Sequence, residues 1–155
     1  MNVSLGQVAV HSKRLLLIDP ALIDHWTRDE SLDGLYDVAC WGRDAEMLSE
    51  ALGWPLPHLA ENVALEEARA IYGEAVRVRG ENTWWAGVEI RAHSHFWQGD
   101  ALAESQAKGG EILIGDLPAV VLSPGYGDQT QYEVTVEREE QFGLITRLTI
   151  EFIRD

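Results

Sequence analysis

The sequence is poor in cysteine and has no long apolar run. Cys40 is its only cysteine, so no disulfide can form within the chain and no zinc site can be built from several thiolates. No apolar run approaches the length that crosses a membrane, and the first residues lack the basic start and apolar core of a secretory signal. We therefore expect a cytoplasmic protein in a reducing compartment.

Basic residues are also scarce. Twelve lysines and arginines stand against 26 acidic residues, which gives a net charge of -14 and a pI near 4.6. A surface this negative repels the phosphates of nucleic acids and anionic membranes, whereas it speeds the approach of a basic protein. The charge therefore disfavours nucleic acid and membranes as direct partners. It leaves two interpretations open: acidity that only keeps the protein soluble, or an acidic face that binds a basic protein.

The length and composition predict one globular domain over residues 1–155. A chain of 155 residues with 46% hydrophobic residues can bury a core without disulfides or metal. Strand-like stretches lie at both ends and helical patterns lie between them. We expect an α+β fold with a mostly antiparallel sheet and two short helices in the middle of the chain. The predicted strands cover 3–10, 15–19, 83–93, 111–114, 119–122, 132–137 and 144–152, and the predicted helices cover 44–52 and about 62–72.

The predicted strand from Thr83 alternates between two faces. Trp84 belongs to the apolar face, which we expect to be buried, whereas Trp85 lies on the other face. Trp97 also falls outside the apolar stripe. Exposed aromatic side chains beside acids make good anchors for a protein partner. Cys40 lies between apolar neighbours, which predicts a buried structural thiol rather than a nucleophile.

The same region ends in a His-x-His pair. His93 and His95, two residues apart on an extended strand, would point to the same side and could share one divalent metal, with Asp100 as a third candidate ligand. With Gly87 before it, the pair resembles half of the first cupin motif, which implies a metal-binding barrel. The alternative is that both histidines are partly exposed residues of a polar strand face.

The loop Ser123 to Gln129 is rich in glycine and includes Tyr126 and Asp128. Such loops often bind partners, although the glycines also suit a simple hairpin turn. Elsewhere the sequence has no phosphate-binding glycine loop with a lysine, no Gly-x-Ser-x-Gly elbow and no His-Glu-x-x-His helix. We find no complete catalytic motif.

Several segments resemble known families. Residues 13–26 (KRLLLIDPALIDHW), 35–40 (LYDVAC) and 111–118 (EILIGDLP) are similar to immunity proteins of bacterial polymorphic-toxin systems. This resemblance implies a protein that binds and neutralises a cognate toxin, often without catalysis of its own. Residues 125–128 (GYGD) and the closing strands resemble an uncharacterised bacterial family with a Gly-Asp-Gly-x-Tyr pattern, whose second glycine is Gln129 here.

The sequence thus favours a non-catalytic, acidic interaction protein without a cofactor. We expect it to be an immunity-type inhibitor that binds and occludes a basic protein partner, such as a toxin or a nucleic-acid-handling enzyme. One alternative is a small metal-dependent enzyme or ligand-binding barrel with one divalent metal on the His-x-His pair. Another is a phage-encoded inhibitor that mimics the charge of nucleic acid. The oligomeric state stays open. The expected partner contacts are Trp85, Glu89, Trp97, Asp100, Tyr126 and Asp128.

Overall fold

The computed structural model describes residues 2–11, 13–124 and 130–152. Their strands pair antiparallel into three small sheets, which confirms the expected α+β class with a mostly antiparallel sheet. The strands are β1 (Asn2–Val10), β2 (Leu15–Leu17), β3 (Leu35–Trp41), β4 (His58–Ala64), β5 (Gly87–Ala92), β6 (Gly109–Ile114), β7 (Leu117–Leu122), β8 (Thr130–Arg138) and β9 (Ile145–Ile150). The helices are the 3-10 helix η1 (Pro20–His25), α1 (Ala45–Leu52), α2 (Leu65–Asn82) and α3 (His95–Glu104).

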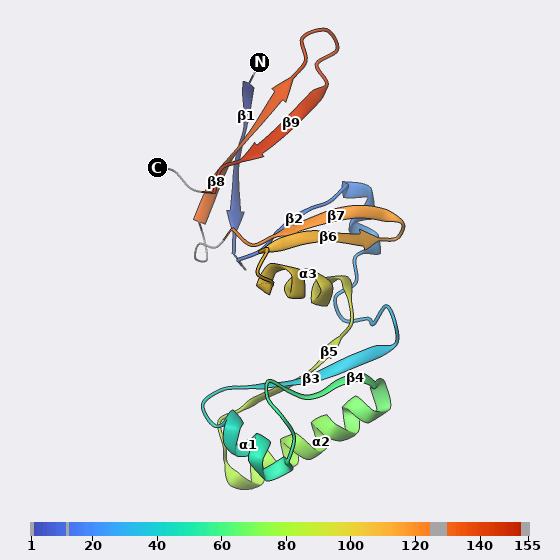
Figure 1. Ribbon diagram of the computed structural model, residues 1–155, viewed down its shortest axis with the longest axis vertical. Helices are drawn as coiled ribbons and strands as arrows, with labels where there is room; N and C mark the ends of the chain where they lie inside the picture. The colour runs from blue at the N-terminus through green and yellow to red at the C-terminus, as the bar shows by residue number, and fades with distance from the viewer. Residues whose placement is uncertain (1, 12, 125–129, 153–155) are drawn as a thin grey trace.

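The three sheets follow one another along the long axis of the molecule (Figure 1). The first has the strand order β4-β3-β5 and carries α1 and α2 on one face. The second has the order β2-β7-β6 and packs against α3. The third, β1-β8-β9, extends beyond them, with no helix on it in the view of Figure 1. Within the described ranges, no helix combines the length and apolar character needed to cross a membrane.

One hydrophobic core lies between the β4-β3-β5 sheet and its two helices. Alternate residues of β3 and β5 point to the helices, so that Val38 and Cys40 are buried there and Val88 packs against them. Leu48 of α1 is fully buried in the same cluster. Trp84 packs on this core, as its apolar face predicts, and Cys40 is the buried thiol that its neighbours predict.

A second core lies between α3, η1 and the β2-β7-β6 sheet. Ile112, Ile114 and Val121 supply the inner face of the sheet, and Ala103 of α3 and Leu22 of η1 cover it. Small residues bring α3 close to the sheet. A Cβ on Gly99 would lie 3.4 Å from a methyl group of Val121.

The predicted helix at about 62–72 is longer and starts later than expected. α2 runs from Leu65 to Asn82, and Asn62, the expected cap, lies in β4 instead. Gly73 was expected to end the helix, but it adopts no left-handed conformation, and the helix continues until Thr83, which has a φ of 54°. A glycine ends a helix where its backbone adopts the left-handed conformation. A glycine with helical backbone angles lowers the stability of the helix but does not end it.

A third helix, α3, was not expected. The strand predicted for 83–93 covers only Gly87–Ala92, and the chain turns at Ser94, whose side chain accepts a hydrogen bond from the Trp97 amide and caps α3. The buried residues of α3 are His95, Gly99 and Ala103, a histidine and two small residues. Where a helix lies close to a sheet, small side chains are enough to fill the space between them. The buried face of α3 therefore shows no stripe of large apolar residues in the sequence.

Alanine substitutions at two glycines should have opposite effects on stability. Gly109 has a φ of 158°, and a Cβ there would lie 2.5 Å from the Val121 carbonyl oxygen, which cannot rotate away. Gly73 lies inside α2 with no neighbour within 4 Å of an added Cβ. We expect Gly109→Ala to destabilise the protein by about 1–3 kcal/mol and Gly73→Ala to stabilise it by about 0.5–1 kcal/mol. Urea unfolding of both variants measures the two changes, and a shared sign would contradict this packing.

Candidate functional site

A groove of about 1080 Å³ lies between the β4-β3-β5 sheet and α3. One wall is the sheet face that points away from α1 and α2, because the residues that alternate with the core positions of β3 and β5 point into the groove, and α3 forms the opposite wall. Cross-strand pairing places Asp37 of β3 beside Arg91 of β5. Charged and aromatic side chains from all of these elements line the groove. They are Asp37 (β3), His58 and Glu61 (β4), Glu89 and Arg91 (β5), Trp97, Asp100 and Glu104 (α3), and Arg14, which lies between β1 and β2.

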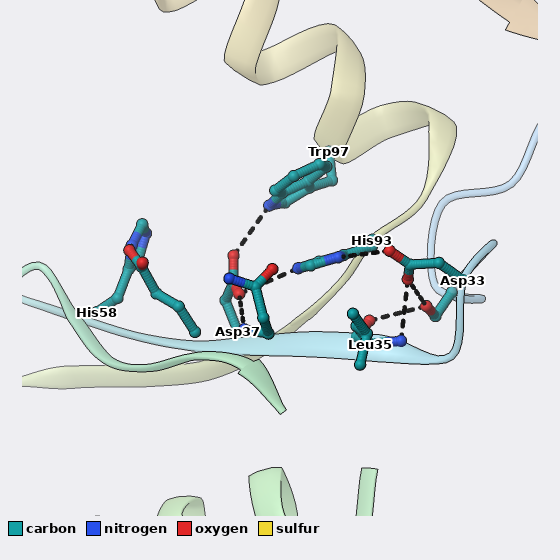
Figure 2. A network of polar contacts seen from close by, with 9 residues as sticks. Asp33, Leu35, Asp37, His58, His93 and Trp97 are labelled. Atoms are coloured by element: carbon teal, nitrogen blue, oxygen red, sulfur yellow. Dashed lines mark hydrogen bonds and ion pairs between the residues drawn. The ribbon is translucent and has the colours of Figure 1, made fainter. Parts of the chain in front are cut away.

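Asp37 is the most buried acid of the groove, with 4% of its surface exposed. Its Oδ1 accepts hydrogen bonds from the Asn62 amide at 2.9 Å and from His93 Nε2 at 3.0 Å. Its Oδ2 accepts one from Trp97 Nε1 at 3.2 Å. These donors come from β4, from the turn after β5 and from α3, and Figure 2 shows His93 and Trp97 converging on this carboxylate. Asp37 therefore connects three separate elements.

His93 lies between two carboxylates. Its Nε2 contacts Asp37 and its Nδ1 contacts Asp33 Oδ2, both at 3.0 Å, and its ring stacks on Trp97 with centroids 4.2 Å apart (Figure 2). Burial alone would lower the pKa of His93, but the hydrogen bonds to both carboxylates and their charges outweigh it, so the pKa lies above the ordinary value. The imidazolium form can donate to both acids at once, and we assign that form to His93.

Asp33 holds the outer end of this network. Burial opposes its ionisation, but hydrogen bonds from the Leu35 amide, His93 and the Ser31 hydroxyl outweigh that effect and lower its pKa to about 2. Its Oδ1 accepts from both Leu35 N and Ser31 Oγ, at 2.9 Å each. The start of β3 is thus fixed against the same histidine that binds Asp37.

A second pair of charges lies on the α3 side of the groove. Arg14 Nε contacts Asp100 Oδ1 at 2.7 Å, and the side chains are 27% and 33% exposed. Burial raises the pKa of Asp100 above its ordinary value, with Arg14 and Arg91 opposing the shift. Glu104, one turn further along α3, also contacts Arg14. This pair joins the segment before β2 to the helix.

The structure separates the two histidines of the His-x-His pair. β5 ends at Ala92, so His93 and His95 do not share a strand, and both are only 4% exposed rather than partly exposed. His95 is the first residue of α3, where its Nδ1 accepts a hydrogen bond from the Thr27 amide. Burial lowers its pKa. Among the described residues, no group of three or more histidines, cysteines or acids is arranged to hold a metal ion.

Three of the expected partner contacts meet in the groove: Glu89, Trp97 and Asp100. Trp85 lies elsewhere, 72% exposed, beside a smaller pocket of about 410 Å³ that Trp41 and Trp84 also line. Tyr126 and Asp128 lie outside the described residues. The sequence interpretation missed Asp33 and Asp37. Asp37 carries a signal that could have found it, because it is a single charge inside the otherwise uncharged strand Leu35–Trp41.

Charged side chains of both signs line the groove. Asp37 and His93 use their polar atoms on one another and on neighbouring residues, so the network positions the walls. The carboxylates of Glu61 on β4 and Glu104 on α3 are 57% and 76% exposed, and they stand on opposite walls. Such groups suit a ligand that carries positive charge.

Comparison with known proteins adds no relative. No protein-family model, curated protein or solved structure matches this chain.

The central ion pair predicts a stability that depends on pH. We expect His93→Ala to lower the free energy of unfolding by about 3 kcal/mol at pH 5, because the buried Asp37 carboxylate loses its cationic partner. The folded-state pKa of His93 is raised above 6.5, so its stabilisation is complete below that value and is lost as the pH rises through the folded-state pKa. The difference between wild type and variant should therefore narrow from pH 5 to pH 9 in urea unfolding.

The control is His25→Ala, because His25 is an exposed residue at the end of η1. We expect it to change stability by less than about 0.5 kcal/mol. Because the pKa of Asp33 falls from 3.8 to about 2 on folding, its own stabilisation is lost as the pH drops from about 4 through about 2, below the tested range. If the free energies of unfolding of wild type and His93→Ala differ by the same amount from pH 5 to pH 9, the ion-pair assignment is wrong.

Proposed function

We propose that this chain is a non-catalytic, acidic interaction protein of the cytoplasm. Its role would be that of an immunity-type inhibitor that binds and occludes a basic protein partner, such as a toxin or a nucleic-acid-handling enzyme. The observation that carries the proposal is the groove, where exposed carboxylates of β4 and α3 stand on opposite walls. A basic segment of a partner that lies between these walls would meet negative charge on both sides.

Three of the four arginines that line the groove already pair with acids. Arg91 pairs with Glu89, Arg14 with Asp100 and Glu104, and Arg69 with Glu66, whereas Arg28 lies over the ring of Phe96. The net charge of -14 adds a long-range attraction that brings a basic partner to the surface quickly. The immunity-type resemblance of the sequence supports the same class of function.

The mechanism is steric occlusion with a prepared surface. The Asp37 network holds β3, β4 and α3 in place before any partner arrives, so that binding does not have to order the groove walls. Electrostatic attraction then raises the association rate, and contacts within the groove set the dissociation rate. A partner whose active surface enters the groove would be blocked without chemical change.

Charge reversal on the two walls tests the proposal. We expect Glu61→Lys with Glu104→Lys to abolish capture of a basic partner from a lysate of the source organism, since both walls change sign. Both side chains are more than half exposed, so the fold should tolerate the change. Capture by the wild type should also weaken as NaCl rises from about 0.05 to about 0.3 M. Mass spectrometry identifies the bound protein and metal analysis examines the bait.

The matched control is Glu46→Lys with Glu50→Lys, which makes the same change of charge on α1, behind the sheet. This variant should still capture the partner. Equal loss in both variants would mean that bulk charge, and not the groove, is responsible. A bait that carries stoichiometric metal and binds no protein would overturn the proposal in favour of a metal-dependent role for His93 or His95.

A further inference from the structure

The three sheets have six edge strands, and an edge strand exposes a row of backbone groups that can pair with another chain. Proteins usually protect such edges with charged side chains, with shortness, with β-bulges or with a covering element. Five edges of the described sheets are short or carry charged residues. β2 is only three residues long, and the other four contain charged residues: Glu61 in β4, Glu89 and Arg91 in β5, Glu111 in β6, and Arg147 in β9.

β1 is the exception. Its nine residues, Asn2–Val10, contain no charged side chain and no proline, in a chain where 25% of residues are charged. Six of the nine positions are exposed, including Leu5, which is 53% exposed. The strand has one irregularity, between Ser4 and Gly6, and the stretch from Gly6 to Val10 pairs regularly with β8. On its other side, the edge from Gly6 to Val10 has no charge, proline or irregularity to protect it.

The sheet that contains β1 shares no described residue with the two hydrophobic cores. Val10, Tyr132 and Val136 of this sheet are buried, but none of them belongs to either core. Figure 1 shows this sheet projecting from the rest of the molecule, with no helix on either side. Three strands alone are the minimum for a stable sheet, so additional strands would stabilise it.

We propose that β1 pairs antiparallel with β1 of a second copy of this chain, which joins two three-stranded sheets into one of six strands. The charge of the chain points to this strand. Two copies at -14 each repel one another, and the contact that minimises this repulsion is the edge that has no charge. A pairing centred on Val8 uses the regular stretch Gly6–Val10 and has two-fold symmetry.

This inference goes beyond the proposed function and does not depend on it. No residue of β1 lines the groove, so the pairing leaves both grooves of the dimer accessible. The dimer would present two binding sites to a partner. Because self-association is measured on the purified chain alone, its failure and the failure of partner capture are separate results.

The test places lysines on the edge of β1. Gln7 and Ala9 are exposed, and in a pairing centred on Val8 position 7 of one copy faces position 9 of the other. Gln7→Lys with Ala9→Lys therefore sets lysine against lysine twice. The change lowers the net negative charge of each copy, which by itself would favour association. We nevertheless expect dimerisation to weaken by at least about tenfold, measured by sedimentation equilibrium on the full chain.

Thr146→Lys with Thr149→Lys is the matched control, because it makes the same change of charge on β9, the opposite edge of the same sheet. This variant should dimerise at least as well as the wild type. Dimerisation of the wild type should strengthen as NaCl rises from about 0.05 to about 0.5 M, because salt screens the repulsion between two acidic copies. Circular dichroism checks that all variants are folded.

Three results would overturn the inference. The wild type could stay monomeric up to about 200 µM at high salt, a concentration far above a micromolar dissociation constant. The two lysine variants could weaken association equally. Salt could dissociate the dimer, which would indicate an ionic contact elsewhere.

Discussion

The contact between His93 and Asp37 is the interaction on which the arrangement of this molecule depends. It joins the β4-β3-β5 sheet to the turn that begins α3, and α3 in turn packs on the β2-β7-β6 sheet. Two buried charges are costly unless each finds a partner, and here each finds several: Asn62 and Trp97 on the acid, Asp33 on the histidine. The groove exists because this contact holds its two walls at a defined separation.

The same contact gives the two histidines of the His-x-His pair different surroundings. A histidine between two carboxylates has both ring nitrogens occupied as donors, so neither is available as a metal ligand while the network is intact. His95 is occupied separately, with Nδ1 on Thr27 and its ring near Trp26. Two residues of chain are enough to place one histidine at the end of a strand and the other at the start of a helix.

Local patterns predicted seven of the nine described strands and α1, because alternation and helix-ending glycines are short-range signals. β3 and β4, which carry much of the candidate site, were not predicted as strands. Gly53 ends α1 as expected, in a left-handed conformation with a φ of 70°. α3 could not be predicted in this way, since its buried face consists of His95, Gly99 and Ala103 and depends on a close neighbour. Residues Glu89, Trp97 and Asp100 were predicted as contacts one by one, but their meeting in one groove depends on how β5 and α3 pack. Asp33 and Asp37 were missed because their partner, His93, lies more than 50 residues away.

The distribution of charge gives the two proposed surfaces different characters. Six acidic side chains line the groove, where three of the four arginines pair with neighbouring carboxylates, and β1 contains no charged residue. A surface that is negative but locally compensated favours a partner of opposite charge, whereas an uncharged strand edge favours backbone pairing, which needs no opposite charge. Two copies of a chain with such a net charge repel one another least where they meet at uncharged strand edges, whereas exposed acids attract a basic protein. Separating the two kinds of surface onto different sheets allows both contacts to form at once.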